Sequence, residues 1–266
     1  MFLHSTRSTV SVFTAVRFLL TISHFFSSFL QKDEKFQAAS RAVCPAGKPY
    51  LDPFQFNFIV NIPGQTVAHH IDGVYFWGAT RFEFPQWLLA AMKFSGLWEK
   101  EFVGQVQVVS YLHKWTDERA GKFVYWTENG DAKSMNPTSR SANVVDGSRV
   151  VHAATVYRPE VSPPVLNPAH KNSLDYIPSE DKWIIRSNGE NRTVLSTDDL
   201  RISIVYRAKC FKDKEEADRF RSQKDEDMMT LESVLTRFKE DLVKRGKLTE
   251  GQEISAFDLG MLIVKT

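Results

Sequence analysis

The triplet His70-Ile71-Asp72 contains two side chains that could bind one metal ion. In an extended chain, residues two apart project from the same face, so the imidazole and the carboxylate would lie side by side. Chance alone gives about 0.4 such triplets in a chain of this composition, so the triplet needs support from the rest of the sequence. The adjacent His69 would lie on the opposite face, and we assign it a supporting or structural role.

Two later segments supply that support. His152 lies in the β-rich segment "RVVHAATVYR", and Arg201 and Ser203 lie two apart in "LRISIVYRAKCF". Two histidines and one carboxylate form a facial triad, which binds Fe(II) and leaves positions open for a bidentate co-substrate and dioxygen. A guanidinium fork pairs with the distal carboxylate of such a co-substrate, and a hydroxyl on the same strand face can bind the same group. Each residue alone would more often be structural, but their order and β context together favour an iron site.

In these segments the sequence resembles the 2-oxoglutarate- and Fe(II)-dependent dioxygenases, particularly the prolyl-hydroxylase-like branch. The resemblance covers residues 54–158 and 200–211. It is carried by Gly64 ahead of the His-x-Asp triplet, the glycine-led "GKFVYW", the segment "NVVDGSRVVHA" and the terminal "RIS". The resemblance implies a mainly β protein with flanking helices, built on a double-stranded β-helix, or jelly-roll, core of two antiparallel sheets.

The resemblance also implies a chemical role for each site residue. The implied Fe(II) ligands are His70, Asp72 and His152, and the implied residues for the co-substrate 2-oxoglutarate are Arg201 and Ser203. Such an oxidoreductase is a hydroxylase that couples decarboxylation of 2-oxoglutarate to oxidation of a prime substrate by dioxygen. The motifs do not identify that substrate, which could be a small molecule or a protein. If Arg201 is not the carboxylate clamp, Arg158 and Arg207 are the next candidates.

Two other functions fit a jelly-roll with this metal site. One is a cupin-like metal-binding or scaffold protein without turnover, which would bind iron and leave 2-oxoglutarate intact. The other is a metalloenzyme that uses a different divalent ion for isomerisation or hydrolysis, which would not need Arg201 and Ser203 together. A metal-loaded structure with an oxoglutarate analogue would best separate these hypotheses.

The elements that position the site are predicted from hydrophobic periodicity. Strict alternation in "FQFNFIVNI" predicts a strand, and the "PG" that follows predicts a turn into an extended segment with the triplet. Apolar residues at helical spacing predict a helix over residues 84–98, between Pro85 and Gly96. The predicted strands are residues 54–62, 67–72, 104–112, 121–126, 141–148, 149–158 and 200–211.

One compact domain is expected, with additions on both sides of its core. The divisions are an N-terminal helical segment or targeting peptide (1–40), a double-stranded β-helix domain (41–211) and a charged helical C-terminus (212–266). Proline-rich residues 159–199 predict an irregular insertion with at most one short strand, at "KWIIRS". This insertion and "YFWGATRFEF" are the candidate substrate walls beside the iron. The insertion accounts for the long interval between His152 and Arg201 if its two ends lie at neighbouring strand ends of the core.

Composition excludes several other classes of protein. A net charge of +2 over 266 residues does not indicate a nucleic-acid partner, and no membrane span is expected, because charged and polar residues interrupt the apolar N-terminal stretch. Cys44 and Cys210 lie far apart without redox or zinc spacing, so we expect buried thiols. The cytoplasm is the favoured compartment, and the acid-free N-terminus also fits a mitochondrial one. His113 and His170 lack partners at ligand spacing and are not assigned.

Overall fold

The computed structural model describes residues 32–265 of the chain. Most of the N-terminal segment expected to be a helix or a targeting peptide therefore lies outside the described residues. The described part opens with helix α2 (Glu34–Val43), whose N-cap Asp33 accepts a hydrogen bond from the Phe36 amide at 2.7 Å. No helix within residues 32–265 is long and apolar enough to cross a membrane.

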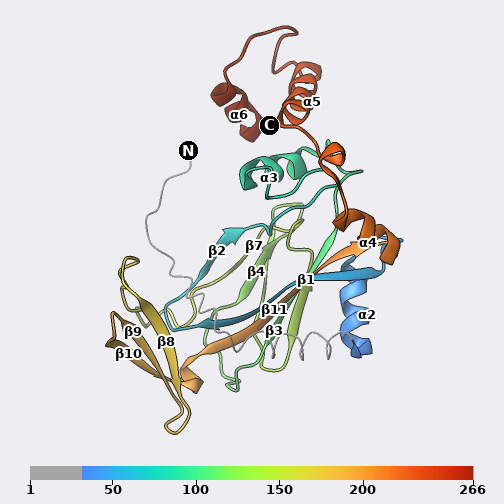
Figure 1. Cartoon of the computed structure of the whole chain (residues 1–266). Coiled ribbons are helices and arrows are strands. Elements are labelled where there is room, and N and C mark those ends of the chain that lie inside the picture. The colour runs from blue at the N-terminus through green and yellow to red at the C-terminus, as the bar shows by residue number, and fades with distance from the viewer. Residues whose placement is uncertain (1–31, 266) are drawn as a thin grey trace.

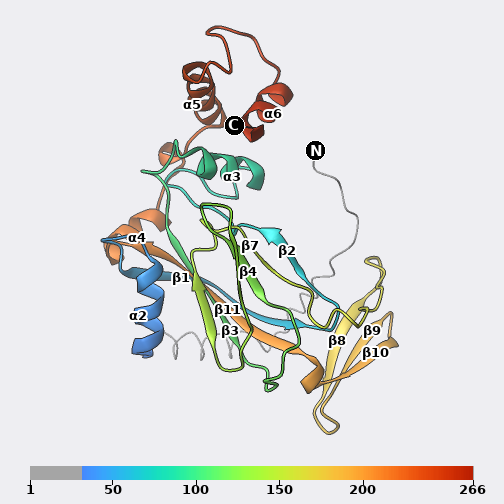
Figure 2. The ribbon, with the colours of Figure 1, turned by 180° about the vertical axis from the view of Figure 1, so that it is seen from behind.

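Two four-stranded antiparallel sheets form the centre of the molecule (Figures 1 and 2). One sheet has the order β1-β11-β3-β6 and the other has the order β2-β7-β4-β5. The first contains β1 (Tyr50–Asn61), β3 (Gln105–Tyr111), β6 (Ala142–Val145) and β11 (Arg201–Phe211). The second contains β2 (Val67–His70), β4 (Phe123–Trp126), β5 (Ala132–Met135) and β7 (His152–Ala154). The protein is mainly β, and the two sheets are compatible with a jelly-roll core. Only β5 was not among the predicted strands of these sheets.

Strand β11 separates apolar from polar residues on its two faces, as its alternating sequence predicts. On one face Tyr206 and Ala208 are buried below α2, and the Tyr206 ring meets the Phe36 ring edge-on at 5.1 Å. Burial of each large apolar side chain stabilises the fold by about 1.5–3 kcal/mol. The other face carries Arg201 and Arg207, and Arg207 reaches the segment just beyond β2. This polar face therefore looks into the space between the two sheets.

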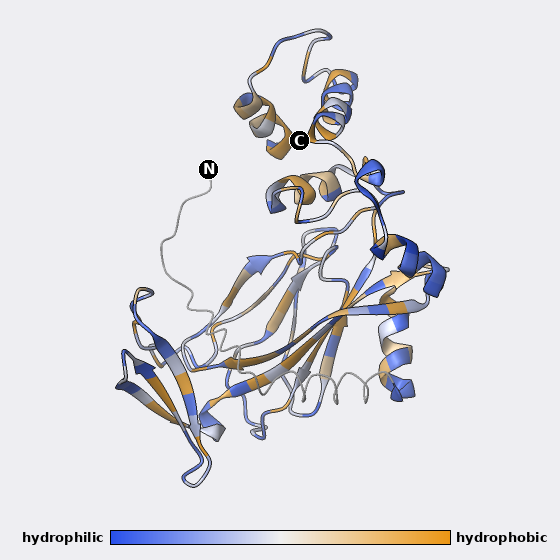
Figure 3. Ribbon diagram, in the orientation of Figure 1, coloured by the Kyte–Doolittle hydropathy of each residue, from blue (hydrophilic) through white to orange (hydrophobic). Residues whose placement is uncertain are grey.

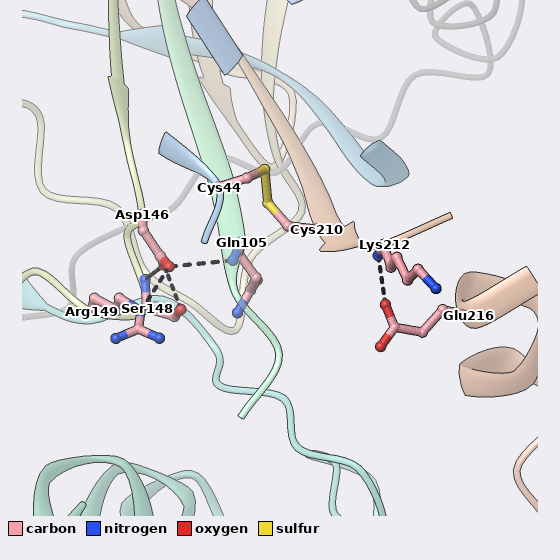
Figure 4. The surroundings of a disulfide bond; sticks show 8 residues. All are labelled: Cys44, Gln105, Asp146, Ser148, Arg149, Cys210, Lys212 and Glu216. Carbon is pink, nitrogen blue, oxygen red and sulfur yellow. Dashed lines mark hydrogen bonds and ion pairs between the residues drawn. A yellow bond between two sulfur atoms is a disulfide. The ribbon is translucent and has the colours of Figure 1, made fainter. Parts of the chain in front are cut away.

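Cys44 and Cys210 form a disulfide, and the expectation of two buried thiols was wrong (Figure 4). The bond joins the end of α2 to the end of β11 across 166 residues. Gly104 permits this approach, because a Cβ atom there would lie 2.6 Å from the Pro45 ring. Closing so long a loop limits the unfolded chain and is worth roughly 4–5 kcal/mol in the chain-entropy model. Sequence spacing carries no signal for a pair brought together by folding.

The insertion between β7 and β11 is a three-stranded antiparallel sheet rather than irregular chain with one strand. Its strands are β8 (Asn172–Ile177), β9 (Lys182–Ser187) and β10 (Glu190–Ser196), followed by the short 3-10 helix η1 (Thr197–Asp199). Ile185 of β9 packs with Leu200 and Ile202 at the start of β11 and with Ile62 at the end of β1. The sheet thus covers the apolar side chains at the end of β1 and the start of β11, and Figure 1 shows it projecting away from the helices.

A missed turn signal explains the error in the insertion. Asn188 and Gly189 join β9 to β10, and both have positive φ, at 51° and 84°. Asn-Gly is the preferred pair for such two-residue hairpin turns, because these residues tolerate the left-handed region. Residues 188–189 therefore predict a hairpin, although the prolines of the surrounding segment favoured irregular chain.

Helices cover the other end of the molecule, where α3 (Gln86–Ser95) begins after Pro85 and ends at Gly96. Its residues Leu88 and Met92 pack with Phe238 of α5 and Leu259 of α6 in the largest buried cluster. On α5, Val234, Phe238 and Leu242 are buried in this cluster, whereas Leu231 is exposed. Hydrophobic residues recur along α5 and α6, whereas α4 is mostly hydrophilic (Figure 3). The remaining elements are α4 (Lys214–Arg221), η2 (Asp225–Asp227), α5 (Leu231–Lys244) and α6 (Ala256–Lys265).

Candidate metal centre

The three predicted metal ligands lie together at one end of the second sheet. His70 ends β2, His152 begins β7, and the two residues are directly opposed in the antiparallel register. Their ring centroids are 4.3 Å apart, and His70 Nε2 lies 3.9 Å from Asp72 Oδ1. One ligand atom from each of the three side chains lies within 4.8 Å of the other two. Small side-chain movements would bring these atoms onto one ion, because metal–nitrogen bonds are about 2.0–2.1 Å long.

Backbone carbonyls orient both imidazoles for metal binding. His70 Nδ1 lies 2.7 Å from the Ala68 carbonyl oxygen, and His152 Nδ1 lies 2.8 Å from the Val150 carbonyl oxygen. A carbonyl oxygen only accepts, so each Nδ1 carries a proton, and in the neutral imidazole Nε2 is then the nitrogen with the lone pair. Burial lowers the pKa of His152, which favours its neutral form. Both rings therefore hold Nδ1 on a carbonyl oxygen and leave Nε2 as the atom that a metal ion could bind.

A tight turn packs against the Asp72 carboxylate. The Asp72 amide donates to the Gly147 carbonyl oxygen at 2.8 Å, and a Cβ atom on Gly147 would lie 2.1 Å from Asp72 Oδ2. The buried Asp146 carboxylate holds this turn by accepting from the Ser148 amide at 3.0 Å and from its hydroxyl at 2.6 Å (Figure 4). Burial raises the pKa of Asp146. Only glycine at position 147 leaves room for the carboxylate.

Donors of the protein itself hold two of the three ligands. Arg207 donates from Nη2 to Asp72 Oδ1 at 2.5 Å and from Nε to Oδ2 at 3.2 Å. Gln107 accepts from Arg207 Nε at 2.6 Å, and its Nε2 lies 3.2 Å from His152 Nε2. Since that histidine nitrogen has a lone pair, the amide donates to it. Metal binding therefore requires Gln107 to turn away and Arg207 to share the carboxylate.

Arg201 lies at the start of β11, on the same face as Arg207, but in different surroundings. It is 5% exposed, and its Nη1 lies 3.4 Å from Asn61 Oδ1. Its Nε has no hydrogen-bond partner, and no carboxylate of residues 32–265 lies within ion-pair distance. Ser203, two residues further on, is 3% exposed. A buried guanidinium without an acid is costly unless a ligand supplies one.

The two other candidates for the carboxylate clamp already have acidic partners. Arg158 donates to Glu160 at 3.0 Å and to Asp199 at 2.8 Å, and Arg207 is bound to Asp72 as described. Of these three arginines, only Arg201 lacks an acid among the described residues.

Sequence reasoning missed the residues that surround Arg201. The guanidinium carbon lies 5.2 Å from the centre of the Tyr111 ring, and the Tyr111 hydroxyl accepts from Asn143 Nδ2 at 2.9 Å. Burial raises the pKa of Tyr111, so its hydroxyl keeps a proton to donate. The unassigned His113 stacks on Trp115 at 3.7 Å, and burial lowers its pKa. Tyr111 lies on the same face of β3 as Gln107, but nothing in the sequence placed β3 beside β11.

The remaining histidines lie away from the three ligands. His69 is exposed and its ring meets the Trp126 ring edge-on at 4.5 Å, which agrees with a supporting role. His170 Nδ1 lies 3.0 Å from the Ser187 hydroxyl, within the insertion. Neither belongs to the cluster of potential metal ligands.

Comparison with known proteins gives two distant structural similarities. No family model matches the sequence, and no curated protein matches it. A prolyl-4-hydroxylase from Pseudomonas putida aligns at 13% identity and a TM-score of 0.30, over 71% of this chain and 62% of that chain. The non-heme monooxygenase ThoJ, in a nickel complex, aligns at 11% identity and a TM-score of 0.34, over 84% of this chain and 74% of that chain. At these values the function must be argued from the site itself.

Proposed function

We propose that this protein is an Fe(II)- and 2-oxoglutarate-dependent oxygenase of the hydroxylase type, with a double-stranded β-helix core. The observation that carries the proposal is the buried Arg201, which lacks an acidic partner and lies on the inward face of the strand whose Arg207 binds Asp72. A metal site alone would suit many enzymes. A metal site beside an unpaired guanidinium suits a co-substrate that binds metal at one end and carries a carboxylate at the other.

Each site residue has a defined task in this proposal. His70 and His152 would hold Fe(II) through Nε2, and the Asp72 carboxylate would supply the oxygen ligand. When bound, Fe(II) with 2-oxoglutarate and dioxygen would supply the oxidation that is coupled to release of succinate and carbon dioxide. The protein orients the two imidazoles, keeps the carboxylate in place and limits access of water to Arg201.

The distal carboxylate of 2-oxoglutarate would satisfy the buried groups at the start of β11. Arg201 would pair with it bidentately, and the hydroxyls of Ser203 and Tyr111 would be available as further donors. Directly opposed positions in β3 and β11 place Ser203 beside Tyr111. The ligand thus exchanges an uncompensated buried cation for a hydrogen-bonded ion pair.

The test compares 2-oxoglutarate binding with metal binding in the same variant. Arg201→Lys should weaken 2-oxoglutarate by roughly tenfold to a hundredfold, because a point charge replaces a planar fork and each factor of ten is about 1.4 kcal/mol. Fe(II) affinity, measured by anaerobic calorimetric titration, should change by less than about twofold, since Arg201 is not a ligand. Arg158→Lys is the matched control, because its guanidinium already has two acids. Unchanged 2-oxoglutarate affinity, or equal loss of both ligands, would refute the assignment.

The second candidate function is the non-catalytic metal-binding protein. One observation supports this second function: Arg207 binds Asp72 and Gln107 binds His152, so the protein's own groups already satisfy two of the candidate ligands. Succinate formation by the iron-loaded protein separates the two functions. A catalytic protein releases succinate from 2-oxoglutarate, whereas the alternative binds iron and leaves 2-oxoglutarate unchanged.

The disulfide bears on the compartment in which the protein works. Disulfides persist in oxidising compartments and are rare in the cytosol. The bond between Cys44 and Cys210 therefore favours a secreted, luminal or otherwise oxidising location over the cytoplasm expected from the sequence. Thiol titration of the protein isolated from its native source, with and without reductant, tests this part of the proposal.

A further inference from the structure

The inward face of β11 carries a third cation, Lys209, that the proposed function does not use. Lys209 lies two residues beyond Arg207, on the side of it away from Arg201. Its side chain is about nine-tenths buried, at 8% exposure, and it forms no hydrogen bond or ion pair with residues 32–265. An ammonium group has three donors, so nearly complete burial without a protein acceptor is unfavourable, and only the small exposed part of the residue can be hydrated.

Three aromatic rings surround this ammonium group. Its nitrogen lies 4.1 Å from the centre of the Phe54 ring, 4.3 Å from that of Tyr75 and 5.5 Å from that of Phe220. Ring faces attract a cation, which offsets part of the cost of burial. They do not accept its hydrogen bonds as an oxygen atom would. Phe54 is only half-buried, so the cluster reaches the surface.

The charged groups near Lys209 favour an anionic ligand. Asp52 faces Lys209 across the β1–β11 register, but its carboxylate accepts from Arg221, which also binds Asp218. Arg81 and Arg221 act on Lys209 as like charges, and Asp52 is the single opposing one. Burial lowers the pKa of Lys209 to about 8, so the group is still mostly charged at neutral pH. Cations therefore outnumber the acid around it.

Lys209 also lies close to the candidate metal centre. Arg207, which precedes it on the same face, binds the ligand Asp72, and Tyr75 of the aromatic cluster lies three residues after that ligand. Gln105 opposes Lys209 in the sheet and donates to the backbone carbonyl directly after Asp72 at 2.9 Å. Tyr75 opens the segment "YFWGATRFEF", which the sequence marks as a candidate substrate wall.

From this geometry we infer that Lys209 binds a carboxylate of the prime substrate, with Phe54 and Tyr75 against the apolar part beside it. The inference rests on the proposed function, because it treats the metal centre as the place of oxidation. Arg201 would then hold the carboxylate of the co-substrate on one side of the metal, and Lys209 that of the substrate on the other. The substrate class is an apolar or aromatic carboxylic acid.

Phenylacetate and its uncharged analogue phenylacetamide are suitable probes. The full chain is loaded with Mn(II) under anaerobic conditions, and metal-enhanced relaxation of the probe protons reports binding beside the metal. Phenylacetate should bind at least about tenfold more tightly than phenylacetamide. Lys209→Met should remove this preference, since it replaces the charge and fills the aromatic cluster, while 2-oxoglutarate and metal affinities stay unchanged. Equal binding of the two probes, or an unchanged preference in Lys209→Met, would overturn the inference.

Two controls keep the result interpretable. Lys212→Met removes a lysine whose side chain is 76% exposed, and it should leave the preference intact. If Lys209→Met fails to fold, trace acetylation of the wild-type protein replaces it: phenylacetate must slow acetylation of Lys209 and not that of Lys212. Equal protection of both, or of neither, would count against the site.

The two proposals fail separately in this design. If the wild type does not bind 2-oxoglutarate but prefers phenylacetate in a way that depends on Lys209, the oxygenase proposal is refuted and the anion site stands. Normal 2-oxoglutarate binding without that preference would refute the substrate class alone.

Discussion

Two arginines on one face of β11 have opposite surroundings. Arg207 donates to both oxygens of Asp72, to Gln107 and, at 2.8 Å, to Gln55. Arg201, six residues earlier, is more deeply buried, and it donates to the amide oxygen of Asn61 at 3.4 Å. The charged groups around the candidate metal ligands thus satisfy one another, whereas Arg201 has no acidic partner among the described residues. A buried arginine therefore points to an anionic ligand only where, as at Arg201, the protein supplies no acidic partner.

The largest expected effect comes from removing the acidic partner of Arg207, which would leave it without an acid as Arg201 is. Asp72→Ala should abolish metal binding, because two neutral imidazoles lack the charge that a hard divalent ion prefers. It should also lower the free energy of unfolding by about 3–5 kcal/mol, since it leaves Arg207 buried without its acid. Calorimetric titration with Co(II) and urea unfolding measure the two effects.

A double variant separates these two consequences of Asp72→Ala. Adding Arg207→Met removes the unpaired cation, so stability should recover while metal binding stays absent. Asp117→Ala, which removes an exposed acid, is the control for loss of a negative charge. Metal binding by either Asp72 variant with wild-type affinity would show that the ligands are assigned wrongly.

The next effect concerns the other unpaired cation of β11. The pKa of Lys209 is about 8 in the folded protein against an ordinary 10.5, so the unfolded chain binds more protons between these values. Stability of the wild type should therefore rise as the pH increases from 8 to 10.5. Below pH 8, Lys209→Met should be more stable than the wild type by up to roughly 3 kcal/mol, and the difference should vanish above pH 10.5.

Urea unfolding across this pH range tests the prediction, with Lys212→Met as the control that shows no such trend. A pH-independent difference between Lys209→Met and the wild type would mean that packing rather than charge is responsible. A stabilising substitution at a functional position is expected when an unfavourable group is kept for binding.

The smallest effect is expected from a substitution beside Asp72 that does not touch Arg201. Gly147→Ala should weaken metal binding by roughly tenfold to a hundredfold, as disturbed support of a ligand commonly does, because the added Cβ would overlap the Asp72 carboxylate. The backbone at Gly147 does not have positive φ, so alanine is not otherwise strained. Gly260→Ala in α6 is the matched control, since its nearest neighbour would lie 3.8 Å away. Equal metal affinities in the two variants would contradict the role of the turn.

Alternation carried most of what the sequence could predict about the fold. It separated the two faces of β11, and together with the resemblance it named three ligand candidates that the structure brings within 4.8 Å of one another. The strand of Arg201 contains no acidic residue, which fits its lack of an acidic partner in the described part of the structure. Local patterns suffice for such features, since the side-chain period of a strand is two residues.

Features that depend on distant contacts were not predictable in the same way. The bond between Cys44 and Cys210 and the pairing of Arg207 with Asp72 both join segments separated by more than half of the chain. No local pattern encodes which strand lies next to which, so Tyr111 and Asn61 could not be placed beside Arg201. The hairpin at Asn188 is different, because its turn signal was present and was overlooked.

The insertion leaves and rejoins the two central sheets at neighbouring positions. The Tyr157 hydroxyl donates to the Asp199 carbonyl oxygen at 3.0 Å, and Arg158 pairs with the carboxylate of Asp199 at 2.8 Å. A short turn could therefore replace residues 159–198 without moving either flanking strand, so the segment can be exchanged as a module. The graft would have to cover Leu200 and Ile202, whose apolar side chains the present sheet hides from water.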